Sequence, residues 1–198
     1  SREIEKVDFI IRECLNFVRP AELDLRQVRL GKHLDGVIAR MVALHPGMVF
    51  STQHAVAGDL TVDADPALLE QALTNILDNA ADACQGKGTV TVFVGTSRHF
   101  TDAVRLNRKV QMILPGHSGR EEEFVRIHIR DNGPGIPPEI LDRIFVPFFT
   151  TKKAGTGIGL PLAQKIVHAH GGVLDMNSDV GKGTEFIIKI PVRHGSGR

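Results

Sequence analysis

The sequence predicts an α+β fold in which helices pack against a mixed, largely antiparallel sheet. Residues 89–96 and 124–131 alternate apolar and polar side chains, as strands with one buried face do. Residues 173–178 and 184–190 have the composition of strands and flank a glycine-containing turn, which predicts a hairpin. Helical segments such as residues 66–84 come between these strands. Strand pairs with intervening helices are typical of a two-layer α/β sandwich.

The N-terminal elements are expected to be mostly helical. Residues 1–18 carry apolar side chains at three- and four-residue steps, and Pro20 ends this pattern. The apolar stripe either packs on the following domain or belongs to a helical hairpin, and periodicity does not separate the two. A short extended segment over residues 23–28 and a helix over residues 30–43 follow.

Two strands are expected next, at residues 48–54 and 60–63, with a turn between them at residues 57–59. Strands joined by a short turn commonly pair with each other, so these two are expected to be an antiparallel pair. Asp65 is a suitable N-cap and Pro66 a suitable first residue for the helix that follows.

The second half of the chain contains two irregular segments. Residues 97–123 are polar and without strong periodicity, which predicts a long loop or insertion. Residues 133–159 are rich in glycine and proline. A helix over residues 160–170 is then expected, closed by Gly171 and Gly172.

Composition narrows the class of protein. The chain has 198 residues, of which 42% are hydrophobic and 24% charged, so it can build a core. A net charge of +1 and the lack of Trp and Tyr give no support for nucleic acid or an anionic membrane as a partner. Cys14 and Cys84 lack metal-ligand spacing, which favours a reduced, cytoplasmic setting. No apolar run is long enough to span a bilayer.

A glycine run at residues 155–159 fits neither common phosphate-binding signature. The third glycine of a dinucleotide fingerprint would fall on Leu160, and residues 148–153 before the run have the composition of a loop rather than a strand. A P-loop pattern occurs nowhere in the sequence. Any phosphate binding must therefore use another arrangement.

Four ordered segments together carry a resemblance to a known family. Asn75 and Asn79 lie on one face of the predicted helix, and Asp131 ends a strand before the sequence Asn-Gly-Pro-Gly. Residues 144–152 read Ile-Phe-Val-Pro-Phe-Phe-Thr-Thr-Lys, and the glycine run of residues 155–159 opens a helix. This order and spacing resembles the superfamily that joins gyrase, the large heat-shock chaperones, histidine kinases and mismatch-repair proteins. The resemblance implies a Bergerat-type ATP-binding fold with ATP and Mg²⁺ as ligands.

The resemblance also implies roles for individual residues. Asn79 matches the asparagine that coordinates Mg²⁺, and Asp131 matches the aspartate that accepts a hydrogen bond from the adenine amino group. Asn75 and Lys152 are implied to be catalytic and to bind the nucleotide, although Lys152 can equally be a solvated loop charge. The rest of the implied nucleotide site is Asp82, Gly133, Gly135, Ile136, Phe149, Thr151, Gly155, Thr156, Gly157, Ile158, Gly159, Leu160 and Thr184.

The position four residues before Asn79 distinguishes branches of the superfamily. Hydrolytic members carry a glutamate there that activates water, whereas Asn75 is a poor base. Residues 145–149 match the F box of the histidine kinases. The resemblance therefore implies a histidine kinase catalytic domain similar to nitrogen-regulatory sensor kinases. An ATPase of the gyrase or chaperone type and a non-catalytic nucleotide-binding regulatory module remain the alternatives.

The expected phosphate acceptor is a histidine outside this sequence, because none of the nine histidines precedes the acceptor-box pattern of the family. Residues 1–20 resemble the second helix of a dimerisation hairpin, and residues 21–193 the ATP-binding domain. Residues 194–198 are expected to be a disordered tail. The resemblance implies as partners the acceptor histidine, a response regulator receiver domain and a second copy in a homodimer.

Overall fold

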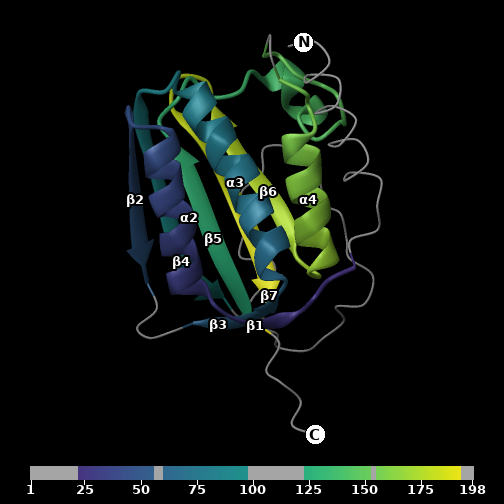
Figure 1. Cartoon of the computed structure of the whole chain (residues 1–198). Helices are drawn as coiled ribbons and strands as arrows, with labels where there is room; N and C mark the ends of the chain where they lie inside the picture. The colour runs from purple at the N-terminus through teal and green to yellow at the C-terminus, as the bar shows by residue number, and fades with distance from the viewer. Residues whose placement is uncertain (1–21, 56–59, 98–122, 153–154, 193–198) are drawn as a thin grey trace, which may run out of the picture.

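The computed structural model describes residues 22–55, 60–97, 123–152 and 155–192. Its centre is a mixed five-stranded sheet in the order β2–β4–β5–β7–β6 (Figure 1). The strands are β2 (Met48–His54), β4 (Gly88–Ser97), β5 (Phe124–Asp131), β6 (Val173–Asp179) and β7 (Gly183–Pro191). β2 runs parallel to β4, and the other neighbouring pairs are antiparallel, as expected of a mixed, largely antiparallel sheet.

Three helices cover one face of this sheet (Figure 1). They are α2 (Leu30–Leu44), α3 (Pro66–Ala83) and α4 (Gly159–Ala169). α3 lies between the other two, and its Leu73 and Ile76 are fully buried in the same core as Ile127 of β5. Helices on one side and a sheet on the other bury a single apolar layer between them. The predicted two-layer α+β sandwich is confirmed.

The start of α3 has the predicted cap. The Asp65 carboxylate accepts hydrogen bonds from the backbone N–H groups of Ala67 and Leu68, both at 3.0 Å. Pro66 occupies the first turn, where a missing N–H costs nothing. These bonds satisfy two donors that a helix start leaves unpaired.

The pairing expected between residues 48–54 and 60–63 is wrong, although both segments are strands. β2 pairs with β4, whereas β3 (Thr61–Ala64) pairs antiparallel with β1 (Arg26–Arg29) in a separate two-stranded sheet. Which strands pair depends on which of their faces can be buried, and not on how close the strands are in the sequence. Thus Val28 and Val62 lie opposite each other across the β1–β3 pair and are both buried.

β1 begins at Arg26, three residues after the expected start of the extended segment. The remaining boundaries lie within two residues of those predicted, except that a short 3-10 helix, η1 (Pro138–Arg143), forms inside the glycine- and proline-rich segment. The N-terminal helix expected over residues 1–18, the turn at residues 57–59 and the tail at residues 194–198 lie outside the described residues, as does most of the loop at residues 97–123. Within the described ranges, no helix is both long and apolar enough to cross a membrane.

Candidate functional site

The predicted site residues gather where the C-terminal half of α3, the end of β5 and the N-terminus of α4 meet. Asn75 and Asn79 come from α3, and Asp131 is the last residue of β5. The turn between β6 and β7 brings Thr184 beside Asp131, to whose carboxylate the Thr184 N–H donates a hydrogen bond. The fold therefore brings together residues that are separated by more than a hundred positions in the sequence.

Asp131 is a buried carboxylate, with 3% of its surface exposed. Its Oδ1 accepts hydrogen bonds from the N–H of Gly133 at 2.8 Å and of Thr184 at 3.2 Å. Burial raises the pKa of Asp131 above its ordinary value, and these two hydrogen bonds act in the opposite direction. A carboxylate has lone pairs for more than two donors, so Asp131 can accept a further hydrogen bond from a ligand.

Ser178 joins the loop after Asp131 to the β6–β7 hairpin. Its Oγ accepts a hydrogen bond from the Ile136 N–H at 2.8 Å and lies 2.9 Å from the Thr184 Oγ1. Gly135 has φ +74°, and a Cβ there would overlap the Asp179 carbonyl. Ser178 could not be singled out from the sequence, since a serine in a strand gives no local signal. The structure shows that it holds Ile136 and Thr184 in place.

The two asparagines of α3 face the start of α4. The Asn79 Nδ2 donates a hydrogen bond to the Asn75 carbonyl at 2.8 Å. The Asn75 Nδ2 is buried and has no partner among the described residues. A Cβ built on Gly159 would lie 3.7 Å from Asn75 Oδ1 and from Asn79 Nδ2. The amide groups thus line a narrow space between α3 and α4.

The segment before α4 folds back on the phenylalanines. The Phe148 N–H donates a hydrogen bond to the Gly157 carbonyl at 3.0 Å. Gly157 has φ +70°, and a Cβ there would lie 2.5 Å from the Phe148 carbonyl carbon, so glycine is required. Phe148 itself has φ +67° and is 59% exposed, which is an uncommon conformation for phenylalanine. Phe149 instead packs under the guanidinium of Arg143, 4.1 Å from its ring centroid.

Lys152 reaches across to α3. Its Nζ donates hydrogen bonds to Asn79 Oδ1 at 2.7 Å and to Asp82 Oδ2 at 2.6 Å. Three residues of the predicted site therefore form one polar cluster at the C-terminal end of α3. In this structure the lysine contacts the predicted metal ligand.

The remaining predicted residues lie along the same segment. Thr151 and Gly155 are exposed, whereas Thr156 is half-buried. Ile158 is fully buried in the core, so only its backbone is available to a ligand, and Leu160 packs against that core.

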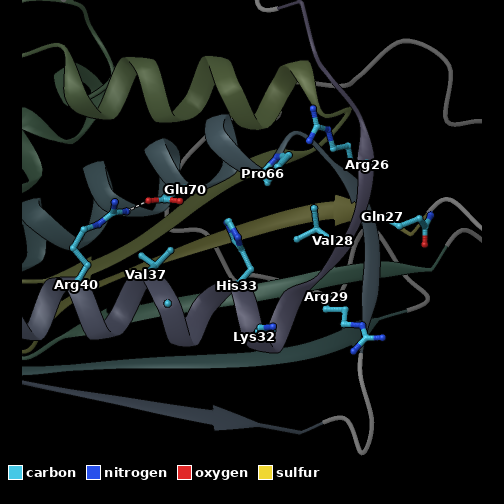
Figure 2. Close-up of a pocket in the computed structure, with 11 residues that line it drawn as sticks. Arg26, Gln27, Val28, Arg29, Lys32, His33, Val37, Arg40, Pro66 and Glu70 are labelled. Carbon is cyan, nitrogen blue, oxygen red and sulfur yellow. Dashed lines mark hydrogen bonds and ion pairs between the residues drawn. The ribbon is translucent and has the colours of Figure 1, made fainter.

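A pocket of about 650 Å³ lies elsewhere, between β1, α2 and the start of α3 (Figure 2). Val28, His33 and Val37 point into it. Two of its three arginines form ion pairs within the described residues, Arg26 with Asp24 and Arg40 with Glu70. The pocket contains none of the predicted site residues. The candidate site is instead the region at the C-terminal end of α3 and the end of β5, where Asn79, Lys152 and Asp131 lie.

The donor set fits a metal–nucleotide complex better than a metal alone. Within the described ranges, no group of three or more His, Cys, Asp or Glu side chains could hold a metal ion. The Asn79 Oδ1 already contacts one cationic group, the Lys152 ammonium. An amide oxygen suits Mg²⁺ when phosphates and water supply most of the other ligands. The glycines that precede α4 leave backbone N–H groups free of side chains near a helix N-terminus, which favours phosphate.

The matches to known proteins agree with this geometry. Residues 64–194 match the family described as histidine kinase-, DNA gyrase B-, and HSP90-like ATPase. The chain is 33% identical over 196 residues to the sensor histidine kinase ZraS of Klebsiella oxytoca, covering 97% of this chain and 37% of that protein. It is 30% identical over 194 residues to the signal transduction histidine-protein kinase AtoS of Escherichia coli, covering 96% of this chain and 28% of that protein. The chain thus spans well under half the length of these curated relatives.

A solved structure is similar over most of the described fold. A mycobacterial sensor histidine kinase, MprB, matches with a TM-score of 0.63 at 26% identity, covering 85% of this chain and 98% of that chain.

Proposed function

We propose, from the premise that this chain belongs to the histidine kinase-, DNA gyrase B- and HSP90-like ATPase family, that it binds Mg-ATP and transfers the γ-phosphate to a histidine in two-component signalling. In this reaction an imidazole nitrogen forms a bond to the γ-phosphorus, and the bond from that phosphorus to the bridging oxygen of ADP breaks. The protein contributes positioning and charge neutralisation, which account for most of the catalysis in phosphoryl transfer.

The observation that carries the choice of kinase over ATPase is the side chain at Asn75. It lies beside Asn79 and faces Gly159, where a general base would have to act on water. An amide cannot accept a proton from water at neutral pH. ATP held here keeps its γ-phosphate until an acceptor arrives.

Individual residues take the following parts in the proposal. Asp131 accepts a hydrogen bond from the adenine amino group, and Thr184 supports the same end of the nucleotide. Asn79 holds Mg²⁺, which when bound screens the charge of the phosphates. The backbone of residues 155–159 binds phosphate. Lys152 is close enough to Asn79 to reach the phosphate end of the site.

The partners of the whole protein are part of the same proposal. We expect the acceptor histidine on a dimerisation domain, for which residues 1–20 supply the second hairpin helix. A homodimer would then bring that histidine to the site, and a response regulator receiver domain would take the phosphate in the cytoplasm. The proposal is consistent with the relatives, which are sensor histidine kinases.

Calorimetric titration of ATP with Mg²⁺ and in EDTA, followed by an assay for released phosphate, tests this function. We expect Mg²⁺-dependent binding with negligible steady release, because the site has a metal ligand and lacks a general base. Sustained release would instead place the chain among the ATPases of the gyrase and chaperone type. Absence of ATP binding would leave a non-catalytic regulatory module.

A further inference from the structure

The Lys152 ammonium is a positively charged group in contact with Asn79, the predicted metal ligand. Its Nζ lies 2.7 Å from Asn79 Oδ1 and 2.6 Å from Asp82 Oδ2, so two oxygens of α3 converge on one positive charge. Asn79 and Asp82 are three positions apart and therefore on the same face of the helix. The Lys152 N–H also donates to the Thr150 Oγ1 at 3.1 Å, which fixes the backbone from which the side chain extends.

Two cations cannot use this oxygen pair together. An amide oxygen has two lone pairs, but an ammonium that donates to Asn79 Oδ1 and a metal ion bound to the same oxygen would be close neighbours, and like charges so close together repel. Lys152 must therefore move when a metal binds to Asn79.

We propose that Lys152 is a built-in competitor of Mg²⁺, whose ammonium is held on Asn79 by Asp82 in the nucleotide-free protein and is displaced when Mg-ATP binds. The proposal rests on the function proposed above. In the nucleotide-free protein the Lys152 ammonium neutralises the charge of the Asp82 carboxylate. The free energy of binding Mg-ATP therefore includes the cost of breaking the Lys152–Asp82 ion pair, whereas that of binding ATP without metal does not.

Asp82 is the residue through which this competition can be tested. Its side chain is 55% exposed, and the ion pair with Lys152 is the interaction that holds the ammonium beside a neutral amide. Asp82→Asn keeps the size of the side chain and removes the charge. It also leaves Lys152 free to contact phosphate, which a substitution of the lysine itself would prevent.

The experiment is calorimetric titration of Mg-ATP, and of ATP in EDTA, into the wild-type chain and the Asp82→Asn variant. We expect Asp82→Asn to bind Mg-ATP about two- to fivefold more tightly, the factor that corresponds to a partly exposed ion pair. In EDTA the gain should be smaller, because Lys152 need not leave Asn79. Glu70→Gln is the matched control, since it removes an ion-paired carboxylate from the same helix at a site away from the nucleotide residues.

Each other outcome overturns the proposal. Simple relief of charge repulsion between Asp82 and the phosphates would favour ATP in EDTA at least as much as Mg-ATP. Weaker binding of Mg-ATP would make Asp82 a metal-binding residue rather than a tether, and unchanged binding would mean that Lys152 does not compete. Failure of the proposed function is a different result, namely that the wild-type chain binds no ATP at all.

Hydrogen exchange without nucleotide is a second test of whether the contact between Asp82 and Lys152 restrains the segment that carries the lysine. Backbone amides of residues 149–152 should exchange about two- to fivefold faster in Asp82→Asn than in the wild type, by the same ion-pair factor. Glu70→Gln should leave them unchanged. Equal exchange in all three proteins would show that the contact does not restrain this segment, and the proposal would fail.

Discussion

Asp131 is the residue at which the demands of binding and of stability oppose each other. The residue is buried in a fold that supplies two N–H donors to one of its carboxylate oxygens. Burial nonetheless raises its pKa, so the folded protein holds the charged form at a cost. Such a cost is expected where a buried charge serves a ligand.

The substitution Asp131→Asn should therefore separate the two properties. The amide oxygen can still accept from Gly133 and Thr184, so the unfolding free energy at neutral pH should be equal to or higher than that of the wild type. The charged group that we propose as the acceptor for adenine is lost, so ATP affinity should fall by about tenfold or more, as for a hydrogen bond to a charged group. Urea unfolding and ATP titration on the same sample measure both. Unchanged ATP affinity would contradict the adenine role of Asp131.

Residues of the site differ in how far the sequence reveals them. Asn79, Asp131 and the glycines stand at fixed spacing within recognisable segments, so their grouping could be predicted. Ser178 could not, because its importance depends on the register of the β6–β7 hairpin, which places it opposite Thr184. The contact of Lys152 with Asp82 was equally hidden, since the side-chain direction of a loop lysine is set by tertiary structure.

At the scale of elements, α3 connects the core to the site. Its first turn is capped by Asp65, whose second oxygen also accepts a hydrogen bond from the Asp24 N–H at 3.0 Å. The Asp65 N–H in turn donates to His170 Nε2, at the end of α4. The cap therefore joins the start of α3, the end of α4 and the strand region before β1. The helix then presents Asn79 about four turns further on.

Removal of the cap by Asp65→Ala should lower the unfolding free energy by about 1 kcal/mol, within a range of about 0.5–2 kcal/mol for such caps. ATP affinity should stay within about twofold, because fraying is confined to the first turn, far from Asn79. Urea unfolding at pH 7 measures the first quantity, and Asp35→Ala on the exposed face of α2 is the control. A loss no larger than that of the control would show that the hydrogen bonds of Asp65 contribute nothing.

Elements were predicted more accurately than their pairing. Alternation and glycine stops locate β4, β5, β6 and β7 to within two residues, because each signal is local. The partners of β2 and β3 depend on burial against the helix layer, which no local pattern records. β4 and β5 were the easiest strands to locate, since both carry a regular alternation of apolar and polar side chains.

At the scale of the whole molecule, the buried carboxylates act on stability in opposite directions as pH changes. The pKa of Asp65 is lowered from its ordinary value of 3.8, because burial, which alone would raise it, is outweighed by hydrogen bonds from the N–H groups of Leu68, Asp24 and Ala67. Its contribution to stability is therefore present above pH 3.8 and is lost as the pH falls below that value. The pKa of Asp131 is raised, so its contribution is present below 3.8 and is lost as the pH rises through the folded pKa.

The same isosteric change at the two positions should accordingly give difference curves of opposite slope. The unfolding free energy of the wild type minus that of Asp65→Asn should be positive near neutral pH and should shrink as the pH falls below 3.8. The same difference for Asp131→Asn should be zero or negative near neutral pH and should rise as the solution is acidified toward 3.8, because only the wild type gains by protonation of the buried carboxylate. Urea unfolding from pH 7 to the most acidic pH at which the chain stays folded gives both curves. Histidines that do not act on either carboxylate contribute equally to all three proteins and cancel, whereas the charge of His170 acts on Asp65 and belongs to the Asp65 curve. Two curves of the same slope would mean that the pKa values of Asp65 and Asp131 are not shifted in opposite directions in the folded protein, against what their hydrogen bonds and burial imply.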